Sequence, residues 1–122
     1  MTTDRFVTEI TLPWPPTQLS PNWTGKLRDK LRAKKQYKHD CFYSAKEDMP
    51  TPPAWVEDGK DVPLTIEFHP PDKRSRDDDN VTGSFKYGRD MVAKALGVDD
   101  KHFRPTYRFC DPVKGGKVIV RI

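Results

Sequence analysis

The chain has 122 residues, of which 34% are hydrophobic and 33% charged, and its net charge is +4. This length fits one domain spanning residues 1–122, with a single small core. No apolar run approaches the roughly 20 residues that span a bilayer, and the N-terminus lacks the basic-then-apolar pattern of a secretory signal, so we expect a soluble, cytoplasmic protein.

The first half of the chain predicts a strand followed by a long helix. Residues 6–12 alternate well enough for a strand, which the prolines of 13–16 end. Residues 17–25 are rich in turn-forming side chains and predict an ordered loop. Residues 26–49 favour a helix, and the proline-rich stretch 49–61 is a surface connection. The apolar positions at helical spacing are Leu27, Leu31, Tyr37, Cys41, Ala45 and Met49.

The second half opens with a strand over residues 62–69, which has Leu64, Ile66 and Phe68 on one face. A helix then runs to about Leu96, with Asp79 or Asn80 as its N-cap and Gly97 as its stop. Its predicted buried stripe is Phe85, Val92 and Leu96.

Residues 106–110 and 117–122 predict two closing strands, joined by a turn that contains "KGG". The resulting order is β-α-β-α-β-β. We therefore expect an α/β fold in which helices pack on a mixed sheet. An oligomer that shares its core between chains would relieve the shortage of hydrophobic residues.

The helix over residues 26–49 is strongly basic, and the sequence pI is about 9.1. Such a segment is either a solvated helix face or a binding surface for a polyanion. Its first four cations are Lys26, Arg28, Lys30 and Arg32.

An acidic run, Asp77–Asp79, follows the cations Lys73, Arg74 and Arg76. Asp77 and Asp79 stand at i and i+2, so in an extended chain both carboxylates share one face and could meet one cation. Mg²⁺ prefers such oxygen ligands. The alternative is that both acids pair with the arginines and that Asp79 caps the helix. A calcium loop is excluded because the required glycine and glutamate are missing.

The cysteines and histidines do not have the spacing of a zinc site. Cys41 and Cys110 lie far apart, and His39, His69 and His102 do not form closely spaced pairs with them. We expect the two cysteines to be small buried side chains or free thiols.

Several motifs occur together in a characteristic order: "ITLPWPP", "SPN", "RDDDN", a lysine followed four residues later by an aspartate, and a final "DD". This set resembles the RusA family of Holliday junction resolvases, which is of bacterial and prophage origin. The resemblance extends from Ile10 to about Arg108. Lys86 and Asp90 match the K-x-x-x-D motif, although five residues, 81–85, separate Lys86 from the asparagine, more than is usual in the family.

The resemblance implies a site for Mg²⁺, with Mn²⁺ as a possible substitute, held by Asp77, Asp79 and Asp100. Lys86 would stabilise charge on the phosphate or orient the nucleophile. Asp99 would be an outer ligand or would position a water molecule, or it is a simple loop acid.

The activity implied is that of a structure-specific endodeoxyribonuclease, which resolves Holliday junctions by paired, symmetric phosphodiester hydrolysis in recombination and repair. It would act in the cytoplasm of a bacterial or phage-infected cell, without a small-molecule cofactor. The alternatives are a non-catalytic module that binds branched DNA or other nucleic acid, and a protein-interaction protein. The expected DNA-binding residues are Lys73, Arg74, Arg76, Asn80, Lys26, Arg28, Lys30 and Arg32. Trp14 and Trp23 would stack on splayed bases or pack against proline.

The predicted helix places its two acidic ends far apart. If residues 82–96 are helical, Asp79 and Asp100 lie roughly 22 Å apart, too far to share one ion. Either a loop folds far back, or Asp100 comes from a partner chain. We favour an intertwined homodimer, which also suits a four-way junction with two-fold symmetry.

Overall fold

A computed structural model describes residues 8–122 of the chain. The sheet has four strands, in the order β1-β4-β2-β3. Strand β2 pairs in parallel with β3 and antiparallel with β4, and β4 pairs antiparallel with β1. The strands are β1 (Glu9–Pro13), β2 (Val62–His69), β3 (Phe103–Phe109) and β4 (Lys117–Arg121). The predicted α/β class with a mixed sheet is confirmed.

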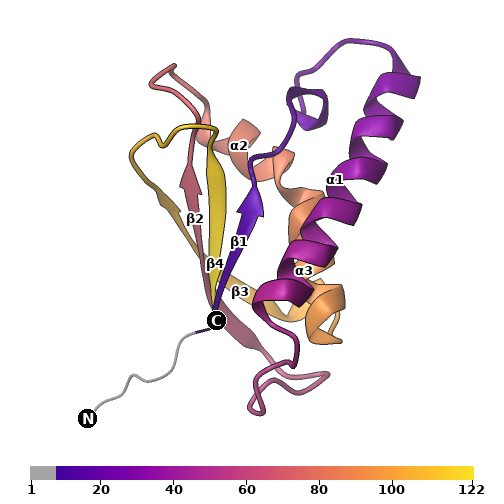
Figure 1. The fold of residues 1–122 in the computed structure, drawn as a ribbon, viewed down its shortest axis with the longest axis vertical. Helices are drawn as coiled ribbons and strands as arrows, with labels where there is room; N and C mark the ends of the chain where they lie inside the picture. Colours follow the sequence, from indigo (N-terminus) through magenta and orange to yellow (C-terminus); the bar gives the residue numbers. More distant parts are fainter. Residues whose placement is uncertain (1–7) are drawn as a thin grey trace.

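Three α-helices cover one face of this sheet (Figure 1). They are α1 (Leu27–Asp48), α2 (Asp78–Ser84) and α3 (Lys86–Leu96), and two short 3₁₀ helices, η1 (Thr17–Leu19) and η2 (Asp100–His102), complete the order. Helix α1 packs against both β1 and α3. None of the helices in residues 8–122 is long and apolar enough to cross a membrane.

The core lies between the helices and the sheet. Strand β2 supplies Val62, Leu64, Ile66 and Phe68, all almost fully buried, and the Phe68 ring meets the Phe85 ring edge-on at 5.7 Å. The predicted stripe of Phe85, Val92 and Leu96 is buried as expected. Because side chains alternate along a strand, the intervening residues of β2 point to the opposite face, which none of the helices in residues 8–122 covers.

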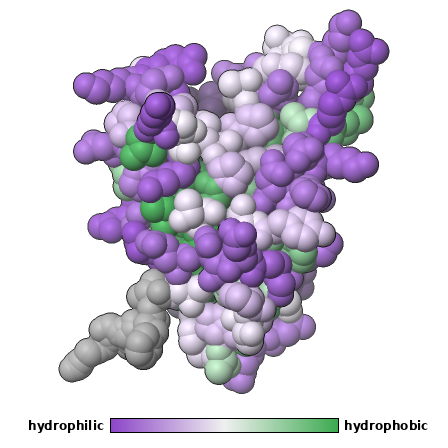
Figure 2. All heavy atoms as spheres, viewed as in Figure 1, coloured by the Kyte–Doolittle hydropathy of each residue, from purple (hydrophilic) through white to green (hydrophobic). Residues whose placement is uncertain are grey.

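The predicted stripe of the first helix is only partly correct. Tyr37, Cys41 and Ala45 are buried, but Leu27 and Leu31 are 69% and 52% exposed. The first turns of α1 therefore extend beyond the sheet, and Figure 2 shows mostly hydrophilic side chains over this end of the molecule.

The second predicted helix is two helices. Phe85, at φ −88° and ψ 0°, separates α2 from α3. The hydroxyls of Thr82 and Ser84 donate to the carbonyls of Asp78 and Asn80, a pattern that bends helices. The N-cap is Asp77, two or three residues earlier than expected, so the predicted cap at Asp79 or Asn80 is wrong.

The closing strands also differ from the prediction. Strand β3 starts at Phe103, because Phe103 pairs with Val62 at the start of β2. Strands β3 and β4 are not neighbours, because β2 lies between them. The predicted strand over residues 6–12 corresponds to β1, and its residues 6 and 7 lie outside the described residues.

Candidate functional site: two acidic groups and a side-chain triad

The acidic run lies at the start of α2, where all three aspartates are exposed. The Asp77 carboxylate accepts the Asp79 backbone N–H at 2.9 Å and so caps the helix. No ion pair within residues 8–122 includes Asp77, Asp78 or Asp79. The alternative in which these acids pair with the neighbouring arginines is therefore wrong for the described chain.

The neighbouring arginines pair with Asp72 instead. The Arg76 guanidinium donates to the Asp72 carboxylate at 2.8 Å, and it lies over the Trp14 ring at 5.8 Å. The Arg76 side chain is only 18% exposed, so it braces the loop. Lys73 and Arg74 remain exposed beside the acidic run.

A cleft of about 500 Å³ opens beside the acidic run. Asp77 and Asn80 line it from α2, Arg74 from the preceding loop, and Trp14 and Trp23 from the N-terminal loop. An adjoining hollow of about 570 Å³ continues between the two tryptophans and α1. The cleft thus joins a carboxylate, a cation and two aromatic rings.

The tryptophans also pack inside the protein. The Trp14 ring meets the Phe68 ring edge-on at 6.3 Å, and the Trp23 ring covers Gly25 so closely that a Cβ there would overlap it. Gly83 similarly gives α2 room to approach Pro21. These contacts fix the wall of the cleft in place.

A second acidic group lies at the other end of α3. Gly97, at φ +76°, ends the helix, and the chain turns back through η2. Asp100 lies there with its carboxylate 3.5 Å from the Arg89 side chain, and Arg89 also donates to the Asp100 carbonyl. Burial and the Asp100 carboxylate raise the pKa of Asp90, while Lys86 and Lys38 act in the opposite direction.

Asp90 is thus a candidate residue that the sequence prediction did not include in the site. Its spacing four residues after Lys86 is the available signal, because residues i and i+4 share a helix face. Asp99, by contrast, is exposed and accepts the Lys101 N–H at 3.0 Å, so it caps η2.

The three predicted metal ligands do not meet within one chain. Among residues 8–122, Asp77, Asp79 and Asp100 do not form a group whose ligand atoms lie within 4.8 Å of one another. Asp77 caps α2 and Asp79 lies in its first turn, whereas Asp100 follows α3 in η2. The first acidic group therefore offers Asp77 and Asp79, and the second offers Asp90 and Asp100, with Lys86 close enough to act on the Asp90 charge.

The first turns of α1 carry the basic residues that the sequence predicts to bind DNA. Lys26 is the N-cap of the helix, and Arg28 and Arg32 are exposed, whereas Lys30 is partly buried. The exposed Leu27 and Leu31 lie between them. This end of α1 therefore presents both charge and apolar surface.

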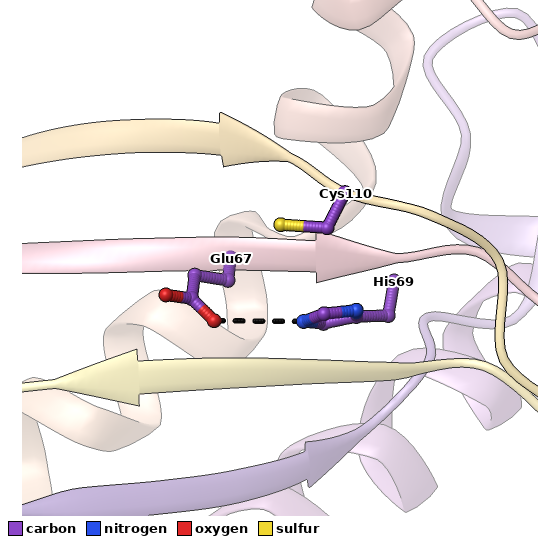
Figure 3. A group of neighbouring side chains, drawn as sticks. All are labelled: Glu67, His69 and Cys110. Atoms are coloured by element: carbon purple, nitrogen blue, oxygen red, sulfur yellow. Dashed lines mark ion pairs between the residues drawn. The ribbon is translucent and has the colours of Figure 1, made fainter.

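A different group of side chains, on the face of the sheet opposite the helices, could hold a metal ion. The ligand atoms of Glu67, His69 and Cys110 all lie within 4.8 Å of one another (Figure 3). Residue spacing does not reveal this group, because strand pairing brings Cys110 beside β2, where its N–H donates to the Phe68 carbonyl.

Arg121 stabilises the ionised form of Glu67. Its guanidinium donates to the Glu67 carboxylate at 3.0 Å, and this hydrogen bond lowers the pKa of Glu67. Burial and the nearby Glu67 charge raise the pKa of the Cys110 thiol. Glu67 is only 8% exposed, so the ionised carboxylate depends on Arg121.

Comparison with known proteins shows a related chain but no matching family model. No family model matches the chain. A protein of Xylella fastidiosa (strain Temecula1), described as uncharacterized, is 36% identical over 114 residues, which cover 93% of this chain and 74% of that protein.

Proposed function

The chain belongs to the same family as the uncharacterized Xylella fastidiosa protein, and we propose that it is a Mg²⁺-dependent, structure-specific endodeoxyribonuclease that resolves Holliday junctions. The observation that carries the proposal is the exposed run Asp77–Asp79, which has no ion pair within residues 8–122 and adjoins a cleft with a cation and two tryptophans. The resemblance of the ordered motifs to the RusA family supports the choice of a four-way junction as substrate.

The acidic run fits a hard divalent cation. Like charges so close together repel one another, and a bound cation removes that cost. Asp77 and Asp79 offer only oxygen ligands, as Mg²⁺ requires, and Mn²⁺ would be accepted by the same atoms. Mg²⁺ bound there would polarise the scissile phosphate and lower the pKa of a water molecule that attacks phosphorus.

Residues around the cleft would hold the DNA. Lys73 and Arg74 are exposed beside the acids and would offset their repulsion of the phosphate backbone. Arg76 would act indirectly, because it holds the loop through Asp72. The faces of Trp14 and Trp23 offer stacking surfaces for unstacked bases at the crossover.

The positive end of α1 would extend the contact to a second arm of the junction. Its cations would contact phosphates without reading sequence. They are Lys26, Arg28, Lys30 and Arg32.

A second copy of the chain would complete the site. Asp100 does not reach Asp77 and Asp79 in one chain, so we assign it to the partner in a homodimer. Asp90, which lies close to Asp100, and Lys86, one helical turn before Asp90, would enter with it. Lys86 would then stabilise negative charge on the phosphate. Two such sites related by a two-fold axis match the two symmetric cuts that a four-way junction needs.

A cleavage assay tests the proposal. The protein is incubated with a synthetic four-way junction or a linear duplex, with Mg²⁺ or with EDTA. We expect paired, symmetric nicks in the junction only, and only with Mg²⁺. Asp79→Asn should abolish cleavage while junction binding is retained or becomes tighter. Equal cutting of the linear duplex, or cutting in EDTA, would contradict the proposal.

The exposed cations of α1 also favour a second candidate, a module that binds branched DNA or other nucleic acid without cutting it. Such a module has no use for Asp77 and Asp79, which repel phosphate when no metal is bound. Salt-dependent junction binding by a wild-type protein that never cuts in Mg²⁺ or Mn²⁺ would select this candidate.

A further inference from the structure

The triad Glu67, His69 and Cys110 differs chemically from the acidic groups. It offers one carboxylate oxygen, one imidazole nitrogen and one sulfur, all within 4.8 Å of one another. Thiolate and imidazole ligands select borderline or soft cations, whereas Mg²⁺ takes oxygen ligands. We propose that the triad is a binding site for a zinc-like divalent cation, separate from the proposed Mg²⁺ site.

The backbone holds these ligands in position. Glu67 and His69 are two residues apart on β2, so both side chains lie on the same face of the sheet. Cys110 follows β3 directly, and Phe109 pairs with Phe68 in the parallel register. Figure 3 shows the three side chains converging from these two adjacent strands.

The His69 ring leaves a buried nitrogen for a ligand. Its Nε2 is buried and has no hydrogen-bond partner among the described residues. The closest carboxylate atom is Glu67 Oε1, at 3.5 Å, and the alignment is not that of a hydrogen bond. A buried nitrogen without a partner is costly, and a metal ion would satisfy it.

The Glu67 carboxylate can bind a cation while it keeps its shorter hydrogen bond from Arg121. That bond goes to Oε2 at 3.0 Å, whereas Oε1, the atom nearer to His69, accepts a longer bond from Arg121 at 3.5 Å, which a cation at Oε1 would displace. Zinc commonly takes three protein ligands and a water molecule in a tetrahedral arrangement. On binding, the Cys110 thiol would lose its proton to solvent, and the resulting thiolate would bond to the metal.

A metal here would cross-link the sheet. Strand β3 is an edge strand that pairs only with β2 within the described sheet, and Cys110 begins the connection from β3 to β4. An ion held by β2 and Cys110 would join the two strands at this end and stabilise the folded state, which alone presents the complete site.

Metal uptake tests the proposal directly. Metal-free protein is titrated with Zn²⁺, and separately with Co²⁺, in buffer containing excess Mg²⁺. We expect one ion per chain, a thiolate-to-cobalt charge-transfer band and a zinc-induced rise in Tm of several degrees. Cys110→Ser and His69→Gln should each weaken zinc binding at least about a hundredfold.

Control variants test whether zinc binds at the triad and not at other thiol, imidazole or carboxylate groups of the chain. Cys41→Ala removes the other thiol and His102→Gln another imidazole, and both should bind zinc as the wild type does. Asp79→Asn should also retain zinc, whatever its effect on DNA cleavage. The proposal is overturned if the wild type takes up no zinc, if Cys110→Ser binds it equally well, or if bound Co²⁺ lacks the thiolate band.

Discussion

Asp77 has two roles in this account, and two substitutions separate them. Its side chain caps α2 by accepting the Asp79 N–H at 2.9 Å, and the same carboxylate is a proposed Mg²⁺ ligand. Asparagine is as good an N-cap as aspartate, whereas alanine costs about 1 kcal/mol. For a domain of this size, that cost lowers Tm by about 3–5 °C.

Asp77→Asn should therefore match the wild type in stability in EDTA, or exceed it slightly, because one of three adjacent negative charges is removed. Asp77→Ala should unfold at a lower urea concentration, because its free energy of unfolding is reduced by the lost cap, about 1 kcal/mol. Both variants should lose junction cleavage in Mg²⁺. Urea titration followed by tryptophan fluorescence, and a nicking assay on the same samples, give the two readouts. Full cleavage by Asp77→Asn would refute the metal role, and an equally stable Asp77→Ala would refute the cap.

Three further changes test other parts of the structure. The pKa of Asp90 is raised in the folded state, so its ionisation destabilises the fold as pH rises from about 4, the usual carboxyl value, through the folded pKa. Asp90→Asn should therefore be more stable than the wild type at pH 7 in EDTA. Unchanged stability in urea titrations would contradict the burial of Asp90 beside the Asp100 carboxylate. Phe85→Ala should cost about 3–5 kcal/mol of unfolding free energy, because the ring is almost fully buried and packs edge-on against Phe68. Phe109→Ala should cost clearly less, because the Phe109 ring is half-exposed, and equal losses would contradict this core packing. Gly97→Ala should lower the free energy of unfolding by about 1 kcal/mol, because Gly97 has a φ of +76°, which strains any residue with a Cβ. A Tm equal to that of the wild type would contradict this strain.

The regular elements of this fold were largely predictable from local pattern. Strand β2 coincides with the predicted range of residues 62–69, and α1 differs from its predicted range by one residue at each end. The helix break at Phe85 was not predicted, because the hydroxyl-to-carbonyl hydrogen bonds of Thr82 and Ser84 that accompany it leave no periodic signal in the sequence. The central position of β2 depends on long-range pairing, which local pattern does not contain.

The candidate sites, too, were predictable only where their residues lie close together in the sequence. The D-x-D spacing predicts a metal site at Asp77 and Asp79, and the structure leaves both exposed; the extended chain that this spacing assumes is not present, because Asp79 lies in α2. Asp90 and Asp100 come close only because the chain turns back at Gly97. The Glu67–His69–Cys110 triad needs the parallel register of β2 and β3, which lie far apart along the chain.

Mixing two inactive variants tests directly whether each site is shared between two chains. Asp79→Asn and Asp100→Asn should each lack junction cleavage alone. If each site takes Asp79 from one chain and Asp100 from its partner, a mixed dimer contains one intact site. Random exchange of subunits should then restore roughly a quarter of the wild-type nicking rate, as single nicks. No recovery, although mass measurement shows that mixed dimers form, would contradict the shared site.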